Sequence, residues 1–122
     1  MQLLFDYSTE NGKTKGLGLI KGSVEKFEFK EKDIKIPNIG WNKVINIKKN
    51  KILSGINKID EFYFVHSYCI KTSEKKAIVS NSNYNNFSFA SVINKNNIYG
   101  CQFHPARSRD QGLIFLKNFC KI

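Results

Sequence analysis

A histidine that could transfer protons lies in the segment Tyr99-Gly100-Cys101-Gln102-Phe103-His104-Pro105. The segment is typical of a strand, and the proline directly after His104 marks the point where a loop begins. Ligands of open α/β sheets bind at this end of a strand, and a neutral imidazole accepts a proton near about pH 7. His104 is therefore a candidate general base, although a lone histidine in such a position is more often structural.

The chain offers no clear nucleophile for this histidine. Cys101 precedes His104 by three positions on the predicted strand, so the two side chains are expected on opposite faces, with Cys101 in the core. Cys69 follows the other histidine-bearing strand and stays open as a nucleophile, whereas Cys120 falls late in the terminal helix and is expected in the core. The three thiols lack close spacing, so neither a disulfide framework nor a metal site is predicted.

The composition indicates one small domain from a reducing compartment. Of the 122 residues, 41% are hydrophobic, which is enough for a single core. The formal net charge is +10, but the lysines are spread along the chain and arginine occurs only as Arg107 and Arg109, so no nucleic-acid partner is expected. No apolar run reaches the roughly 18 residues of a membrane span, and no secretory signal is visible. We therefore expect a cytoplasmic protein without a membrane partner.

The elements that must position His104 are mainly strands. Apolar and β-branched runs predict strands at residues 17–20, 43–47, 62–65, 77–80, 87–93 and 98–103. The remaining predictions are a helix over residues 1–7, a solvated turn at 30–33, a break in regular structure at 37–42 and a hairpin loop at 94–97.

A terminal helix is predicted to begin at Ser108, where Gln111 completes a Ser-x-x-Gln capping box. Its expected apolar face consists of Gly112, Leu113, Phe115, Leu116, Phe119 and Cys120. The glycine-rich residues 16–22 could suggest a phosphate cradle, but no Gly-Lys-Ser/Thr and no helix signal follow. A turn that leads into a strand is expected there instead.

Six segments together resemble the glutaminase subunit of imidazole glycerol phosphate synthase, a class I glutamine amidotransferase. The most specific are Ile36-Pro37-Asn38-Ile39-Gly40-Trp41-Asn42 and Phe62-Tyr63-Phe64-Val65-His66-Ser67-Tyr68, while the segment that ends in His104-Pro105 is shared more widely. The others are Met1-Gln2-Leu3-Leu4-Phe5, Gly16-Leu17-Gly18-Leu19-Ile20 and the stretch from Gly112-Leu113 to Lys117-Asn118-Phe119. The resemblance implies an α/β fold, namely the C-terminal part of a three-layer class I amidotransferase domain with a mixed sheet and a C-terminal helix.

The resemblance also implies a chemistry. In the family, a cysteine thiolate of a Cys-His-Glu triad attacks the side-chain amide of L-glutamine, and the ammonia passes to a synthase subunit built as a (β/α)₈ barrel, without a cofactor. His104 matches the triad histidine. Gln2, Glu10, Ser67 and Tyr68 match positions that line the glutamine pocket, and Trp41 and Tyr63 match positions near the synthase interface.

Two departures from the family pattern bear on activity. The cysteine of the family's Gly-x-Cys-x-Gly elbow corresponds to a position just before Met1, so residues 1–122 are expected to be a single, N-terminally truncated domain. The triad glutamate is replaced by Ala106, which cannot orient His104. In the serine-protease triad, disabling the orienting carboxylate costs roughly 10⁴-fold in rate. We expect a glutaminase subunit by ancestry, from histidine biosynthesis, that is inactive in this form.

Two alternatives stay open. A paralogue that supplies ammonia to surface-sugar biosynthesis through a similar barrel partner would carry the same motifs. A non-catalytic subunit that docks on a barrel synthase through Trp41 and Tyr63 would need no nucleophile.

Overall fold

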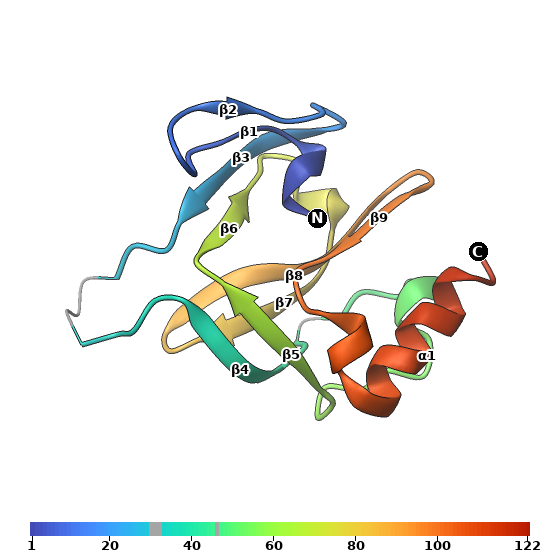
Figure 1. The fold of residues 1–122 in the computed structure, drawn as a ribbon. Helices are drawn as coiled ribbons and strands as arrows, with labels where there is room; N and C mark the ends of the chain where they lie inside the picture. Colours follow the sequence, from blue (N-terminus) through green and yellow to red (C-terminus); the bar gives the residue numbers. More distant parts are fainter. Residues whose placement is uncertain (30–32, 46) are drawn as a thin grey trace.

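The computed structural model describes residues 1–29, 33–45 and 47–122, which form three small sheets and one α-helix (Figure 1). The first sheet has the strand order β2-β1-β3-β6, built from Thr14–Lys15, Phe5–Ser8, Ile20–Lys26 and Tyr68–Lys71. The second pairs β4 (Asn38–Lys43) with β5 (Glu61–His66), and the third contains β7 (Ile78–Tyr84), β8 (Phe87–Lys95) and β9 (Ile98–Cys101). The helix α1 (Arg109–Phe119) follows, and short 3₁₀ segments are η1 (Gln2–Leu4), η2 (Lys51–Leu53), η3 (Lys75–Ala77) and η4 (Pro105–Arg107).

Strand pairing is mixed in direction. β1 and β3 run parallel, while β3–β6, β4–β5, β7–β8 and β8–β9 are antiparallel. This confirms the predicted mixed α/β architecture with a C-terminal helix. The strands are divided among three sheets rather than gathered in one, and an isolated bridge between Ile45 and Asn81 connects the chain after β4 to β7.

Aromatic side chains make up much of the larger core cluster. Phe62 and Phe64 of β5 are fully buried and alternate with the more exposed Tyr63 and Val65, as expected for a strand with one buried face. The ring of Phe103 packs against Phe62, with 4.1 Å between centroids, and α1 adds Phe115 to the same cluster. A second cluster under the first sheet contains Phe5, Ile20, Val24, Ile70, Ala77, Ala90 and Ile93.

The prediction of a helix at residues 1–7 is wrong. Only η1 is helical, and Phe5 begins a strand that pairs with β3 on one side and β2 on the other. A short apolar run fits either a buried helix or a buried strand, and here the backbone partners on neighbouring strands decided for the strand. The N terminus consequently lies near β6 and β9 in the middle of the molecule (Figure 1).

The predicted break at residues 37–42 is also wrong, because these residues largely form β4. Its six residues pair in register with β5, from Asn38 opposite His66 to Lys43 opposite Glu61. The strand predicted at 43–47 is therefore misplaced, since β4 ends at Lys43 and position 46 lies outside the described residues. Proline and glycine are turn signals by local propensity, and pairing with β5 overrides that propensity.

The remaining predictions for the elements are mostly confirmed. Strands occupy most of 62–65, 77–80, 87–93 and 98–103, and residues 94–97 span the β8–β9 hairpin with its turn at 96–97. The strand predicted at 17–20 starts only at Ile20, and the glycine-rich stretch is a turn and strand as expected. Most of the lysine-glutamate turn predicted at 30–33 lies outside the described residues.

Candidate active site

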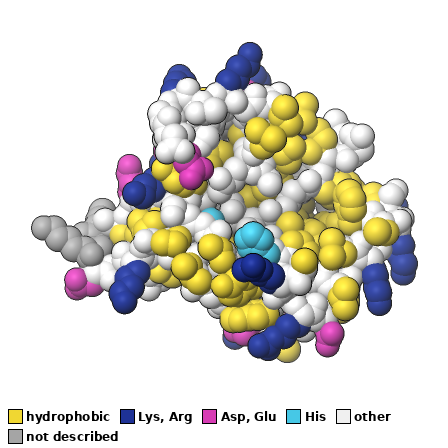
Figure 2. Space-filling view, in the orientation of Figure 1, with side chains coloured by type: hydrophobic (Ala, Val, Ile, Leu, Met, Phe, Trp, Pro, Cys, Tyr) yellow, Lys and Arg dark blue, Asp and Glu magenta, His cyan; other side chains and the backbone are white. Residues whose placement is uncertain are grey.

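A cavity of about 490 Å³ collects the residues predicted to handle glutamine. Gln2, Glu10, Ser67, Tyr68 and His104 all line it, although they come from four segments spread over the chain. Other parts of its wall are Met1, Leu3, Val65, His66, Cys101, Gln102 and Phe103. Figure 2 shows histidine surface open to solvent, bordered by hydrophobic side chains. The fold therefore brings the predicted catalytic and substrate-binding residues to one place.

His104 is exposed, and its backbone is held firmly by neighbouring elements. Its N–H donates to the carbonyl oxygen of Tyr63 in β5 at 2.9 Å, and its own carbonyl accepts from the Ser108 hydroxyl at 2.7 Å. The buried ring of Phe103 fixes the preceding residue in the core. An imidazole carried on this backbone can accept or return a proton at the cavity mouth.

No carboxylate orients the His104 ring within the described residues. Among those residues, the ion pairs are Lys21–Asp6, Lys71–Glu25 and Lys95–Glu74, and none includes a histidine. Ala106, the residue expected to replace the glutamate of a Cys-His-Glu triad, is exposed in η4 and has no polar side chain to offer.

A second histidine is buried in the wall of the same cavity. His66, at the end of β5, is only 7% exposed, and the rings of Phe27, Phe64 and Phe89 surround it. Burial is the main cause that lowers the pKa of His66 to about 4, with a smaller contribution from the nearby His104, and both outweigh a hydrogen bond to the Tyr68 carbonyl that raises it. The His66 ring is therefore neutral at physiological pH and does not act as a general acid.

Gln2 reaches across the cavity wall to two partners. Its side-chain amide nitrogen donates to the Tyr68 carbonyl at 2.8 Å and to Gln102 Oε1 at 3.2 Å. Both bonds join the beginning of the described chain to residues far along it, so the side chain is oriented by tertiary contacts. Glu10, in the turn between β1 and β2, is exposed at the rim.

The thiols of the cavity and core are not activated. Cys101 packs against the larger core cluster, as expected, and also lines the cavity together with His104. The argument from strand alternation does not extend to His104, because β9 ends at Cys101. Burial raises the pKa of the Cys101 thiol to about 11, and burial raises the pKa of Cys69, inside β6, to about 11 as well. Cys120 is exposed rather than in the core. Neither Cys69 nor Cys101 is a thiolate near neutral pH.

Trp41 and Tyr63 lie together, but outside the cavity. They are opposite each other in the β4–β5 ladder, with ring centroids 5.7 Å apart, and Trp41 is 36% exposed. The guanidinium carbon of Arg109 sits 4.4 Å from the Trp41 ring centroid in a cation–π contact. The result is an exposed aromatic surface, with an arginine above it, on the strand that also anchors His104.

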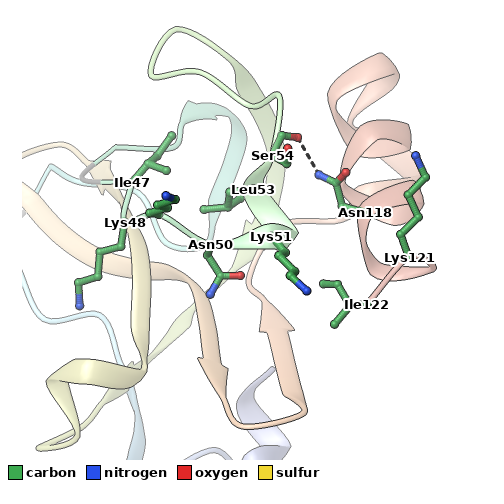
Figure 3. A pocket seen from close by; sticks show the side chains of 10 residues that line it. Ile47, Lys48, Asn50, Lys51, Leu53, Ser54, Asn118, Lys121 and Ile122 are labelled. Atoms are coloured by element: carbon green, nitrogen blue, oxygen red, sulfur yellow. Dashed lines mark hydrogen bonds between the residues drawn. The ribbon is translucent and has the colours of Figure 1, made fainter.

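A larger hollow of about 1070 Å³ lies between residues 47–54 and the end of α1 (Figure 3). Four lysines line it, yet they do not converge. Lys48 donates to the Lys75 carbonyl, and Lys51 and Lys121 extend in different directions. Asn118 closes one side through its bond of 2.8 Å to the Ser54 carbonyl. The lining contains neither a histidine nor an acidic residue, so we do not assign chemistry to it.

Sequence reasoning missed the role of Ser108. The residue is fully buried, and it makes no side-chain capping bond to α1, so the predicted capping box is wrong. Its hydroxyl instead accepts from the Tyr63 N–H at 3.0 Å and donates to the His104 carbonyl. Tertiary partners outcompeted the local cap, and no spacing in the sequence indicates them. The expected apolar face of α1 is also only partly buried, because Leu113, Leu116 and Phe119 are exposed.

Two further features concern other classes of site. Within the described ranges, no group of three or more His, Cys, Asp and Glu side chains is placed to hold a metal ion. No helix in the part of the chain that the structure covers is long and apolar enough to cross a membrane.

Comparison with known proteins identifies a family for this chain. The family model described as glutamine amidotransferase class-I matches residues 1–122. Imidazole glycerol phosphate synthase subunit HisH from Leptospira borgpetersenii is 42% identical over all of this chain and 60% of its own length. HisH 1 from Methanococcus maripaludis is 43% identical, with 58% of its length covered, and HisH from Pyrococcus furiosus is 41% identical, with 61% covered.

The chain belongs to the class I glutamine amidotransferase family, because the family model covers its whole length. It is similar throughout to HisH subunits, and it spans about three fifths of the length of the relatives it matches.

Proposed function

We propose that this chain provides the glutamine-binding part of a glutaminase subunit of the imidazole glycerol phosphate synthase type. The observation that carries the proposal is the single cavity lined by Gln2, Glu10, Ser67, Tyr68 and His104. Identity of about 40% to HisH subunits along the whole chain supports the same assignment and favours histidine biosynthesis over surface-sugar biosynthesis. The ligand is L-glutamine, and the ammonia released by the complete site would serve a synthase partner built as a (β/α)₈ barrel.

In this proposal the roles follow from charge and position. Glu10 offers a carboxylate to the α-ammonium group of glutamine at the rim, and Gln2 and the backbone at Ser67 and Tyr68 offer hydrogen bonds inside. His104 takes a proton from a thiol nucleophile and returns it to the leaving ammonia. Cys69 and Cys101 are not activated for that step, since burial raises the pKa of each thiol to about 11. The chain as described is therefore proposed to bind glutamine without hydrolysing it.

The compartment is proposed to be the cytoplasm. Cys69, Cys101 and Cys120 are all free thiols, which supports a reducing environment.

Calorimetric titration of the chain with L-glutamine tests the proposal. We expect saturable binding that Gln2→Leu and Glu10→Gln each weaken about tenfold, the equivalent of one strong hydrogen bond. Lys121→Ala, in the separate lysine-lined hollow, is the control and should leave binding unchanged. Absence of binding, or equal binding by all variants, would contradict the assignment of the cavity.

A glutaminase assay separates binding from chemistry. We expect no hydrolysis by the chain, with or without a barrel synthase. Hydrolysis that disappears in Cys101→Ser would instead mean that this thiol is the nucleophile and that its neighbourhood changes when glutamine binds.

A non-catalytic docking role is a second candidate, favoured by the pairing of exposed Trp41 with half-buried Tyr63 beneath Arg109. Aromatic residues and arginine are enriched where proteins bind each other tightly. Co-purification with a barrel synthase, together with failure to bind glutamine, would select this role over the first.

A further inference from the structure

A series of hydrogen bonds, each with a defined donor and acceptor, leads from β4 to the cavity. Asn42 Nδ2 donates to Asn38 Oδ1 at 3.1 Å, and Asn38 Nδ2 lies 3.0 Å from His66 Nε2. His66 Nδ1 lies 2.9 Å from the Tyr68 carbonyl oxygen, which also accepts from Gln2 Nε2 at 2.8 Å. The buried members of this hydrogen-bond series are Asn38, 1% exposed, and His66, 7% exposed.

The direction of each bond follows from the chemistry of its partners. A carbonyl oxygen only accepts, so Nδ1 of His66 must carry the proton that reaches Tyr68. In a neutral ring, Nε2 then carries no proton and can only accept a hydrogen bond. Asn38 must therefore turn its NH₂ toward Nε2 of His66 and its Oδ1 toward the NH₂ of Asn42. The alternative, a doubly protonated ring with Asn38 flipped, would bury a cation among phenylalanine rings. Burial, which lowers the pKa of His66 to about 4, excludes that form near neutral pH.

The same logic sets the orientation of Gln2. Its NH₂ donates both to Tyr68 O and to Gln102 Oε1, so both of its donor positions are used. Oε1 is then the group that Gln2 can offer to a ligand, and an oxygen acceptor recognises an N–H group such as an ammonium or a carboxamide. The orientation depends on the Tyr68 carbonyl, which His66 holds from the other side.

We propose that His66 is a positioning residue: its Nδ1–H tautomer, set by the Tyr68 carbonyl and matched by the amide of Asn38, fixes that carbonyl and thereby presents Gln2 Oε1 as an acceptor for an N–H group of an amino-acid ligand. The identification of that ligand as L-glutamine rests on the proposed function, whereas the tautomer and the ordering of Gln2 do not. His66 acts through Tyr68 and Gln2, and it needs no contact with the ligand.

Nitrogen NMR of the unmodified chain tests the first step without any substitution. Long-range ¹H–¹⁵N spectra, assigned with His104→Gln, should show His66 with a protonated Nδ1 and a bare Nε2 at neutral pH. An Nε2–H tautomer or an imidazolium would overturn the proposal, whatever the variants do.

Two matched substitutions test the second step. In His66→Asn the side-chain NH₂ can take the place of Nδ1–H, whereas in His66→Gln it falls near Nε2 and leaves Tyr68 O without that donor. We expect the Gln2 side-chain NH₂ protons to exchange with water about tenfold faster in His66→Gln than in His66→Asn. Equal exchange rates in the two variants, both checked for native circular dichroism, would overturn the positioning role.

Glutamine titration of the same pair gives the third readout. L-Glutamine should bind about tenfold more weakly to His66→Gln than to His66→Asn, and equal affinities would contradict the link from His66 to the ligand. If the unmodified chain binds no glutamine, the proposed function fails, and the exchange of the Gln2 protons still decides the inference about His66.

Discussion

The backbone N–H of His104 donates a hydrogen bond of 2.9 Å to the carbonyl oxygen of Tyr63. Ser108 reinforces this junction, because its hydroxyl bonds both to the Tyr63 N–H and to the His104 carbonyl. The ring of Tyr63 meanwhile packs against Trp41 on the exposed surface of β4 and β5. Tyr63 therefore contacts His104 through its backbone, and it contacts Trp41 of the candidate docking surface through its side chain.

Replacing Ser108 with alanine should weaken this junction. The substitution leaves the Tyr63 N–H without its acceptor and removes one of the two donors to the His104 carbonyl, which still accepts from the Arg107 N–H. An unsatisfied buried polar group costs about 1–3 kcal/mol, so the free energy of unfolding in urea should fall by about that amount. Ser88→Ala, at an exposed serine of β8, is the control and should change it by less than about 0.5 kcal/mol. Equal effects of the two substitutions would show that the Ser108 hydroxyl is replaceable.

The stability of the chain should fall between about pH 6.5 and pH 4 because of His66. In the unfolded chain the ring takes up a proton as the pH falls through 6.5, while the folded pKa of about 4 keeps it neutral. The unfolded state binds more protons in this window, so the free energy of unfolding decreases toward acid, by about 3 kcal/mol in total. Urea unfolding at several pH values measures this decrease.

Variants of the two histidines distinguish His66 from other titrating groups. His104→Gln should keep the decrease, and His66→Asn should remove most of it. Hydrogen-bonded lysines lower the pKa of Glu25 and of Glu74, so the stability that these carboxylates contribute is lost only below their ordinary pKa of 4.5. A pH dependence that persists unchanged in His66→Asn would be inconsistent with a buried neutral ring.

Alanine at Gly112 should destabilise the chain, although the same change usually stabilises an exposed helix by about 1 kcal/mol. A Cβ at this position would clash with the Pro105 carbonyl oxygen and would lie 3.0 Å from Ser108 Cβ. Overpacking of this kind typically costs about 1–3 kcal/mol, and it would push α1 away from the residue that follows His104. Thermal unfolding measures the cost, and Lys117→Ala on the exposed side of α1 should be nearly neutral.

Loss of the Trp41 ring should weaken binding to a barrel synthase, if the proposed docking surface is correct. A central aromatic residue of an interface contributes about 2 kcal/mol or more, so Trp41→Ala should raise the dissociation constant about 30-fold. Ile59, 76% exposed in the connection between η2 and β5, offers a control that should change it less than about twofold. Binding that is indifferent to Trp41 would place the interface elsewhere.

Local sequence patterns correctly predicted the elements whose own residues favour one type of secondary structure, whatever they pack against. The run 62–65, the hairpin around 94–97 and the helix after Ser108 all carry strong signals of their own. Residues 1–7 and 37–42 were mispredicted because their local signals were ambiguous or pointed to turns. Their strands form through pairing with β3 and β5, which lie elsewhere in the chain. For the site, the resemblance of motifs indicated Gln2, Glu10, Ser67, Tyr68 and His104, and the structure brings them to one cavity.

The sequence by itself determined the family of this chain and the residues at which to look for chemistry, because motif types and their order are properties of the chain. Only the tertiary structure decided that Ser108 bridges Tyr63 and His104, that His66 is a buried neutral ring and that Cys101 shares the cavity as an unreactive thiol. Protonation states and hydrogen-bond partners depend on desolvation and on groups distant in the sequence. His104 was visible from its segment alone, and the contacts that hold it appear only once β5 is folded against it.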